Sequence, residues 1–316
     1  MDKLYNYEQL LDEVGNVSKT DRLAYIDFLL MFKGSITRQD LTDFFGIKMA
    51  SASAAISDYR EYRKDNVAYS HKDAKNVIKR SSFNALLNYS AESALGMLAN
   101  GFNKGKFNVT SFLPYERIGF LPRRLDVHLV AKITRAISNK SSITCEYLSH
   151  SSTVHDERTL YPTAIFYDGI SWMFRAFSIS KSTPDGDFRS FNFSRVGSAE
   201  EMPLNLAKKH QTIQSDTDWQ TMIPVVLQIH PSINSDPKKK SVLVHEYGVD
   251  PTTNQLSVSV RAVLFYYLKE QWSIDVRTEN EIEEDNRKLH YNFILKNSST
   301  FKHMKCMEHV FSKGKG

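Results

Sequence analysis

The segment between Trp172 and Val196 limits the possible folds of this chain more than any other segment. It consists of two strand-like runs joined by a short turn. The first run reads W-M-F-R-A-F, and the second, F-R-S-F-N-F-S-R-V, follows a turn that contains Pro184 and Gly186. Alternate positions of the second run hold Arg189, Phe191, Phe193 and Arg195. Side chains along a strand alternate between its faces, so we expect these four to share one face. The pattern predicts either an amphipathic hairpin with arginines at the rim of a core, or a surface that binds a phosphate or a base.

The amino-acid composition is that of an ordinary globular protein and leaves several functions open. With 316 residues, of which 41% are hydrophobic and 24% charged, the chain is expected to form two or three globular domains. A net charge of +5 permits a polyanionic partner without requiring one. Two cysteines far apart in sequence, Cys145 and Cys306, fit a reducing compartment. Neither a signal pattern nor a run of about 18 apolar residues occurs, so we expect a cytoplasmic protein without a membrane span.

Residues 1–82 predict a helix-turn-helix followed by a wing. A first helix is expected to be capped by Thr20 and to end near Lys33. A short helix, R-Q-D-L-T-D-F-F, is capped by Ser35 or Thr37 and ends at a glycine turn. A third helix follows over about 48–64. After it, Val67 and Tyr69 alternate, as do Asn76 and Ile78, around a polar turn, which is typical of a β-wing.

The third helix has an apolar and a polar face. Ala52, Ile56 and Tyr59 fall on one side, which we expect to be buried. Between Lys48 and Arg80, eight basic residues stand against four acidic ones, a net +4. Contact with DNA phosphates requires such a concentration of charge. The candidate DNA-binding residues are Lys48, Ser51, Ser53, Ser57, Arg60, Lys64, Lys72 and Lys75. The alternative is a three-helix bundle that contacts a protein through a solvated basic face.

The middle of the chain predicts helices and then short strands. Residues 83–100 read as a helix within a connector that extends to about residue 122, and an amphipathic helix is expected over Val127–Ser138. A strand around I-T-C-E-Y-L-S and another beginning near Arg158, with Pro162 at its edge or end, precede the hairpin. Several short strands after one helix suggest a small, partly closed β-barrel.

The last third predicts a small α+β domain. A strand, P-V-V-L-Q-I-H-P, is followed by a loop with Lys238 to Lys240 and by a further run, S-V-L-V-H-E-Y. Leu256, Val258 and Val260 alternate, and 262–271 reads as a helix.

Taken together, these motifs resemble the WYL-domain transcriptional regulators, and among them the repressors that sit beside bacterial anti-phage defence operons. The similar segments are F-G-I-K-M-A-S-A-S-A-A-I-S-D-Y, Y-L-S with the two runs of the hairpin, H-E-Y-G-V-D and L-S-V-S-V-R-A-V-L-F-Y-Y-L. The resemblance implies an α+β multidomain chain. Its parts would be a winged helix-turn-helix (1–82), a helical connector or dimerisation element (83–122), an Sm- or SH3-like β-barrel that is the WYL domain (123–200), and a ferredoxin-like C-terminal extension (201–316).

The resemblance also implies a function. It implies a cytoplasmic, nucleoid-associated homodimer that binds a palindromic double-stranded DNA operator and represses a phage-defence operon. A nucleotide or oligonucleotide effector at the barrel would relieve repression, and no cofactor or metal is implied. The family's signature falls on Trp172, Met173 and Phe174, where Met173 and Phe174 depart from the usual Tyr-Leu. Thr163 stands where a His is frequent.

The implied ligand pocket consists of Tyr147, Ser149, Ser151, Arg158, Trp172, Arg175, Arg189 and Arg195. Four arginines that converge on one barrel face would repel each other unless an anion bridges them. Arginine binds phosphate in a bidentate manner, which lysine does not. The alternative for each arginine is an ordinary surface ion pair.

Three other functions remain open at this point. One is an activator of the same architecture, another is an enzyme acting on nucleotides or RNA, and the third is a protein-interaction module. The chain has no P-loop or dinucleotide fingerprint, so no catalytic residue is predicted. His303, Cys306 and His309 lie on one helical face at spacings of three but lack a fourth metal ligand, so no metal site is predicted either.

Overall fold

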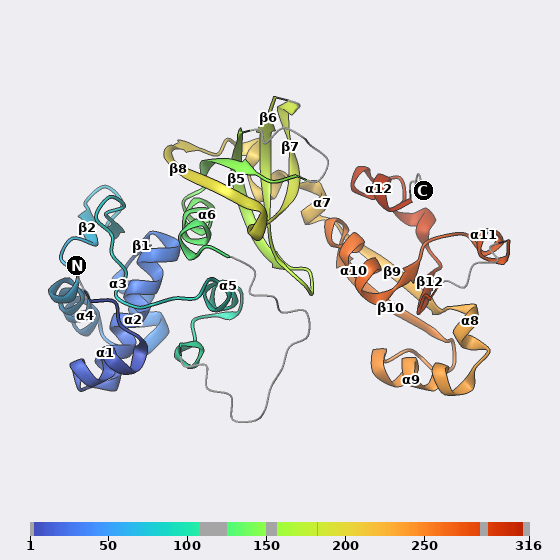
Figure 1. Ribbon diagram of the computed structural model, residues 1–316, viewed down its shortest axis with the longest axis horizontal. Coiled ribbons are helices and arrows are strands. Elements are labelled where there is room, and N and C mark those ends of the chain that lie inside the picture. Colours follow the sequence, from blue (N-terminus) through green and yellow to red (C-terminus); the bar gives the residue numbers. More distant parts are fainter. Residues whose placement is uncertain (1–2, 108–124, 150–156, 182, 285–289, 312–316) are drawn as a thin grey trace. The chain divides into compact units, whose positions relative to one another are not determined.

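The computed structural model describes residues 3–107, 125–149, 157–181, 183–284 and 290–311 (Figure 1). The chain divides into two compact units. The first comprises residues 1–166 and 171–208, and the second comprises residues 167–170 and 209–316. Over the described ranges, no helix is both long and apolar enough to cross a bilayer. Both units combine helices and sheets, so the predicted α+β class is confirmed.

The first unit begins with four helices: α1 (Tyr7–Val14), α2 (Val17–Lys33), α3 (Arg38–Phe45) and α4 (Met49–Tyr62). Thr37 caps α3 in a capping box with Asp40, as one of the two predicted alternatives. The predicted cap of α2 was wrong. Asn16 caps this helix by accepting a hydrogen bond from the Lys19 amide, and Thr20 lies buried one turn inside it.

The wing is confirmed. Strands β1 (Ser35–Ile36), β2 (Val67–Ser70) and β3 (Lys75–Ile78) form an antiparallel sheet in the order β1-β3-β2. The short strand β1 follows α2 directly, and Ser35 pairs with Val77 of β3. The position of the wing is therefore tied to the C-terminal end of α2.

The predicted helix over 83–100 was wrong in its first half. The helix α5 (Ala91–Asn100) begins only after Ser90, which caps it, and η1 (Lys104–Lys106) follows. Before Ser90, the amides of Leu86 and Leu87 donate to the buried carboxylate of Asp27, and Leu87 bridges to Tyr5. These two apolar residues thus join the core from extended backbone instead of from a helix.

Helix α6 (Val127–Asn139) confirms the predicted amphipathic helix and packs against both α2 and a five-stranded sheet. We call this the WYL sheet, because it lies in the segment that was predicted to be the WYL domain. That sheet has the strand order β7-β6-β5-β4-β8. The strands are β4 (Ser141–Tyr147), β5 (Glu157–Tyr167), β6 (Trp172–Ser180), β7 (Thr183–Asn192) and β8 (Val196–Leu206), with η2 (Phe193–Arg195) between the last two.

Two details of this sheet differ from the prediction. Pro162 lies inside β5 and not at its end, two residues beyond Leu160, where the pairing of β5 with β4 stops. The strand β7 ends at Asn192, so Phe193 and Arg195 lie in a turn and do not continue the alternation of Arg189 and Phe191.

The second unit is built on a sheet with the order β10-β9-β12-β11. Its strands are β9 (Met222–Ile229), β10 (Gln255–Arg261), β11 (Ile274–Asp275) and β12 (Phe293–Leu295). Its helices are α7 (Thr217–Gln220), α8 (Pro231–Asn234), α9 (Pro237–Tyr247), α10 (Phe265–Trp272), α11 (Glu279–Glu283) and α12 (Glu308–Phe311), with single turns η3 (Lys209–Gln211), η4 (Ile213–Ser215), η5 (Ala262–Leu264), η6 (Ser298–Thr300) and η7 (Lys305–Met307).

The predicted loop at Lys238 to Lys240 was wrong. These lysines and the run after them form the helix α9, because Asp236 caps it and Pro237 occupies its first position. The predicted helix over 262–271 is confirmed as η5 and α10. One core fills this unit, with Val225, Phe265 and Phe293 among its fully buried residues.

Candidate nucleic-acid interface and ligand site

Helix α4 presents the polar face that the sequence predicted. Ala52, Ile56 and Tyr59 are buried against the other helices. On the opposite side, Ser53 is exposed in the first half of the helix, and Ser57 is exposed one turn further on. Lys48 is exposed at the N-cap, Ser51 is half-buried, and the exposed Ala54 lies among them without a hydrogen-bonding group. A helix start lined by small side chains can approach the floor of a major groove closely.

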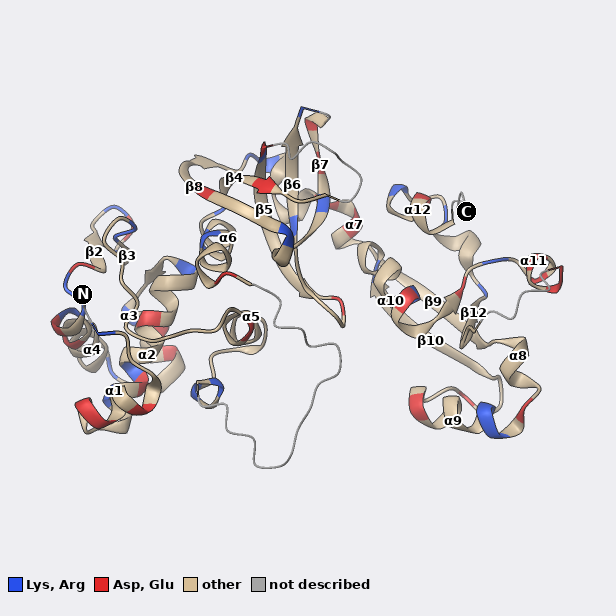
Figure 2. Cartoon of the chain, viewed as in Figure 1, with Lys and Arg blue, Asp and Glu red and all other residues tan. Residues whose placement is uncertain are grey.

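Four lysines around this face make no ion pair with any residue that the structure describes: Lys48, Lys64, Lys72 and Lys75. Lys72 lies in the turn between β2 and β3, and Figure 2 shows basic residues at this tip of the wing. The Nη2 atom of Arg60 donates to Oδ1 of Asn76 at 2.8 Å. This bond links α4 to β3, so Arg60 orients the wing against the helix while its side chain stays at the surface.

Three other basic residues of this region are engaged within the protein. Arg63 is only 5% exposed and donates to backbone carbonyl oxygens, including those of Asn84 and Ala85. Lys79 pairs with Asp65 at 3.6 Å, and Arg80 pairs with Glu201. The positive charge available to a nucleic acid is therefore smaller than the charge counted along the sequence.

A buried polar network anchors α4. The hydroxyl of Tyr59 donates to the carboxylate of Asp27 at 2.6 Å and accepts a hydrogen bond from the side-chain amide of Asn66 at 2.8 Å. Asp27 is completely buried in α2, and this burial raises the pKa of its carboxyl above the ordinary value, although the hydrogen bonds from Tyr59 and the Leu86 and Leu87 amides lower it. This network was not predictable from local sequence patterns, because Asp27 lies far from Tyr59 and Asn66 in the chain.

The inner face of the WYL sheet brings some of the predicted ligand residues together. Arg158 lies opposite Cys145 in the β4–β5 pairing, and its guanidinium carbon lies 5.7 Å from the centre of the Tyr147 ring. The Nε atom of Arg158 is buried and has no hydrogen-bond partner among the residues described. The Tyr147 hydroxyl accepts a hydrogen bond from the Asn192 amide at 3.1 Å. Burial raises the pKa of the neighbouring Cys145 thiol to about 12 despite the nearby guanidinium, so this cysteine is a neutral core residue.

The predicted convergence of four arginines on one face was wrong, because Arg175 and Arg189 lie on opposite faces of the hairpin. In the β6–β7 pairing, Arg175 lies opposite Ser190, whereas Arg189 lies opposite Ala176. Adjacent positions on one strand point to opposite faces, so Arg175 and Arg189 lie on different faces of the hairpin. Arg175 is buried, and its guanidinium lies 5.9 Å from the centre of the Phe188 ring.

The remaining predicted residues are distributed as follows. Arg189 is exposed, and its Nη2 atom donates to Oγ1 of Thr183 at 3.3 Å. The carbonyl of Arg195 accepts a hydrogen bond from the Leu148 amide, which places η2 beside the end of β4 and near the half-buried Ser149. Trp172 packs, partly buried, against the core of the first unit. Ser151 lies outside the described residues.

The metal candidate in the second unit gains no geometric support. Over the described ranges, no three His, Cys, Asp or Glu side chains are grouped closely enough to hold a metal ion. The ring of His309 packs against that of Tyr266, with 5.1 Å between their centres.

Known protein families match almost all parts of this arrangement. The winged helix-turn-helix domain of the BrxR transcriptional regulators matches residues 18–100, and the WYL domain matches residues 128–201. The C-terminal dimerization domain of the BrxR transcriptional regulators matches residues 222–301.

Individual relatives are similar over most of the chain. The DNA-binding transcriptional repressor CapW of Escherichia coli (strain KTE188) is 28% identical over 270 residues, which are 83% of this chain and 85% of that protein. CapW of Pseudomonas aeruginosa is 29% identical over 286 residues, which are 89% of this chain and 90% of that protein. Among solved structures, the proteasome accessory factor B/C (PafBC) of Arthrobacter aurescens is 16% identical, with 78% of this chain and 44% of that chain covered. Its TM-score of 0.23 is too low to carry an argument.

The relatives are named as DNA-binding transcriptional repressors, which agrees with the prediction that this chain is a regulator and not an enzyme. The family matches lie in the order that the sequence motifs predicted, with the winged helix first and the dimerization domain last. They show that the chain carries the winged helix-turn-helix and C-terminal dimerization domains of the BrxR transcriptional regulators, with a WYL domain between them.

Proposed function

We propose that this chain is a homodimeric repressor that binds an operator through α4 and the wing and that loses affinity for it when a nucleotide or oligonucleotide binds the WYL domain. The proposal rests above all on the face of α4, where exposed serines adjoin lysines that no described residue pairs with. The similar CapW proteins are named as DNA-binding repressors, which supports the sign of regulation. We further propose that the chain acts at the nucleoid on a phage-defence operon.

In this proposal α4 enters the major groove and the wing contacts the phosphates beside it. Two copies of α4 in a homodimer would read half-sites separated by about 34–36 Å, one helical turn, or by a multiple of this distance. Serine hydroxyls bond to several bases, so the exposed Ser53 and Ser57 discriminate weakly on their own. Much of the sequence preference is then expected from the shape and deformability of the operator.

The effector site is proposed at the inner face of the WYL sheet around Arg158 and Tyr147. A buried guanidinium nitrogen to which no described residue offers an acceptor is costly, and a phosphate oxygen would supply a hydrogen bond there. The ring of Tyr147 lies beside this guanidinium and also contacts the ring of Phe191, whose strand face Arg189 shares. An anionic nucleotide fits these groups better than a neutral ligand. We also propose that this sheet closes as the Sm- or SH3-like barrel and that the second unit is ferredoxin-like, as the family resemblance implies.

The dimer contact is proposed on the second unit, which matches a dimerization domain. In the β9–β10 pairing, Val225 and its neighbours on one face fill the core. The other face of these two strands carries Met222, Pro224, Val226, Gln228, Gln255, Ser257, Ser259 and Arg261. Only one of these residues is charged, and Arg261 is bound to the carbonyl of Trp219. A largely uncharged sheet face of this kind suits an isologous contact with a second copy.

A salt titration of operator binding tests the DNA-binding part. Purified protein is mixed with the duplex upstream of its own gene, and unrelated duplex serves as competitor. We expect binding that survives the competitor and a logarithmic salt slope set by the number of phosphate contacts. A reporter driven by the same promoter distinguishes repression from activation. Binding that disappears equally on both duplexes at modest salt would contradict the proposal.

A further inference from the structure

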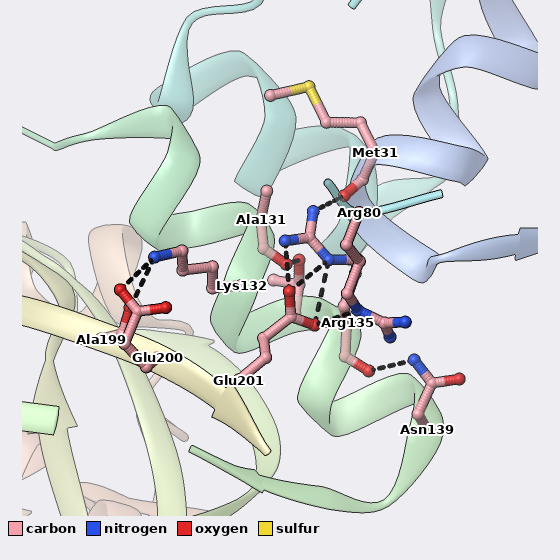
Figure 3. A network of polar contacts seen from close by, with 10 residues as sticks. Met31, Arg80, Ala131, Lys132, Arg135, Asn139, Ala199, Glu200 and Glu201 are labelled. Carbon is pink, nitrogen blue, oxygen red and sulfur yellow. Dashed lines mark hydrogen bonds and ion pairs between the residues drawn. The ribbon is translucent and has the colours of Figure 1, made fainter. Parts of the chain in front are cut away.

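An ion-pair cluster joins the WYL sheet to the winged helix (Figure 3). Its centre is Glu201 of β8, whose side chain is only 8% exposed. Arg135 of α6 binds both carboxylate oxygens of Glu201, with Nε at 3.1 Å from each and Nη2 at 2.6 Å from Oε2. From the wing side, Nε of Arg80 donates to Oε1 of the same carboxylate at 3.2 Å. One carboxylate thus holds two guanidinium groups that belong to different domains.

Each arginine connects Glu201 to a part of the DNA-binding domain. Arg80 follows the wing strand β3 by two residues. The Nη1 atom of Arg135 donates to the carbonyl of Met31 at 2.7 Å, in the last turn of α2. This turn ends at Gly34, whose carbonyl accepts a hydrogen bond from the Ile78 amide of β3. Two routes of direct contact therefore lead from the WYL sheet to β3.

The fit between α6 and this turn is close. Gly34 has a φ of +82°, and a Cβ atom there would lie 3.3 Å from Cδ of Arg135 and 3.2 Å from Nδ2 of Asn139. The end of α2 can therefore change its position only if α6 also moves.

The strand that carries Glu201 also begins beside the proposed effector site. Val196, at the start of β8, pairs with Tyr147, and Arg195 precedes it. The regular pairing of β8 with β4 runs from Ser198 to Met202, and a register irregularity lies at each end of this stretch. A displacement of β8 at the effector site would be passed along this regular stretch to Glu201.

We propose that Glu201 is the positioning residue through which the WYL domain holds the wing in its DNA-binding position. The inference rests on the proposed function, of which it specifies the coupling. A bidentate ion pair requires a narrow alignment of its two groups, so a small displacement of Glu201 breaks it. The wing can then have two arrangements, one with the ion pairs formed and one with them broken. Glu201 acts on DNA only through Arg80 and Arg135, and it does not touch the nucleic acid itself.

The test uses the full-length protein and matched variants. Glu201→Gln removes the charge of the central carboxylate, and Glu200→Gln removes the neighbouring charge, which pairs with Lys132. Arg80→Ala breaks the wing contact alone, and Lys79→Ala removes the adjacent basic residue of the wing, which pairs with Asp65. Hydrogen exchange of the β2 and β3 amides reports the wing without DNA, and operator affinity is measured in parallel.

Exchange of the wing amides is expected to rise in Glu201→Gln and Arg80→Ala and to stay unchanged in both controls. Operator affinity is expected to fall about fivefold or more in the first two variants, the lower end of coupling between linked sites. Arg80→Lys, which keeps the charge, is expected to recover part of the affinity. If Glu201→Gln does not fold, Arg80→Ala decides the question, since it leaves the pair between Arg135 and Glu201 intact.

Wing exchange in Glu201→Gln and Arg80→Ala equal to that in the controls would overturn the inference. Failure of the proposed function is a separate result, because unaltered protein would then bind operator and competitor alike. A 5′-phosphorylated tetradeoxynucleotide serves as the effector probe. If it releases the operator from unaltered protein, wing exchange is expected to rise with it, and release without such a rise would also overturn the inference.

Discussion

Removal of the Tyr59 hydroxyl tests the anchor of the recognition helix. In Tyr59→Phe the ring still fills its buried site in α4, but two hydrogen bonds are lost. Every hydrogen bond that the structure describes at the Asp27 carboxylate is donated to it, by the Tyr59 hydroxyl and by the Leu86 and Leu87 amides. We therefore treat Asp27 as ionised at neutral pH and its bond to Tyr59 as charge-assisted.

The expected loss of stability follows from these two bonds. A hydrogen bond to a charged group contributes about 1.5–3 kcal/mol, and an ordinary one contributes about 1 kcal/mol. The side-chain amide of Asn66 loses its hydrogen bond to Tyr59 but keeps the one to the carbonyl of Asn84, so it contributes less than a full hydrogen bond to the loss of stability. We expect Tyr59→Phe to lower the free energy of unfolding by about 2–3 kcal/mol. For a unit of roughly 200 residues this corresponds to a fall in Tm of about 5–10 °C.

Scanning calorimetry at neutral pH measures this change as a shift of the transition of the first unit. Tyr69→Phe is the matched control, because Tyr69 lies exposed on the wing. Operator affinity well below the transition should stay within about twofold, since the substitution leaves the exposed face of α4 intact. Equal Tm values for Tyr59→Phe and Tyr69→Phe would refute the assignment of the network as the anchor.

Four further predictions follow from the same structure. Lys64→Ala should weaken binding to all duplexes and reduce the logarithmic salt slope by about 1, as a gel-shift salt titration would show. Burial raises the pKa of the Asp27 carboxyl, so this group stays protonated to higher pH in the folded state than in the unfolded state. Protonation of Asp27 therefore stabilises the folded state at low pH, and this stabilisation is lost as pH rises through the folded-state pKa. Unfolding free energies of the unaltered protein relative to Asp27→Asn should therefore increase as pH falls from 7 to 4. Arg158→Ala should abolish release by an oligonucleotide and preserve operator affinity, and loss of both would contradict the division of roles. Ser257→Glu should shift the dimer towards monomer in sedimentation analysis, because symmetry places two new charges on one interface.

Local patterns were sufficient to predict much of the first unit. The capping box of Thr37, the apolar spacing of Ala52, Ile56 and Tyr59, and the alternation of the wing all act within a few residues. Each of these signals depends only on the spacing of apolar residues within one helix or strand, or on the residues that cap one helix. They can therefore be recognised in a single sequence. The predicted interface of α4 and the wing followed from them.

Features that depend on distant partners were not predictable in this way. The extended backbone at Leu86 and Leu87 depends on Asp27, about 60 residues earlier in the chain. Arg63 adds to the positive charge counted along the sequence, but its guanidinium donates to the carbonyl oxygens of Lys3 and Asn84 in the interior and is not offered to DNA. The relative faces of Arg175 and Arg189 depend on the register between two strands, which neither strand specifies alone.

The places of Met173 and Phe174 in the sheet show what these two positions of the family signature do. Phe174 is fully buried, and its ring stacks on that of Phe191 at 5.3 Å, whereas Met173 is buried on the opposite side of the strand. Both side chains are therefore packing residues, and replacing one apolar side chain by another of different size preserves that role where neighbours adjust. The departure from Tyr-Leu at these two positions consequently bears on how the core is filled. In the proposed function, recognition of a ligand is assigned instead to Arg158 and Tyr147, whose guanidinium and ring lie on the inner face of the same sheet.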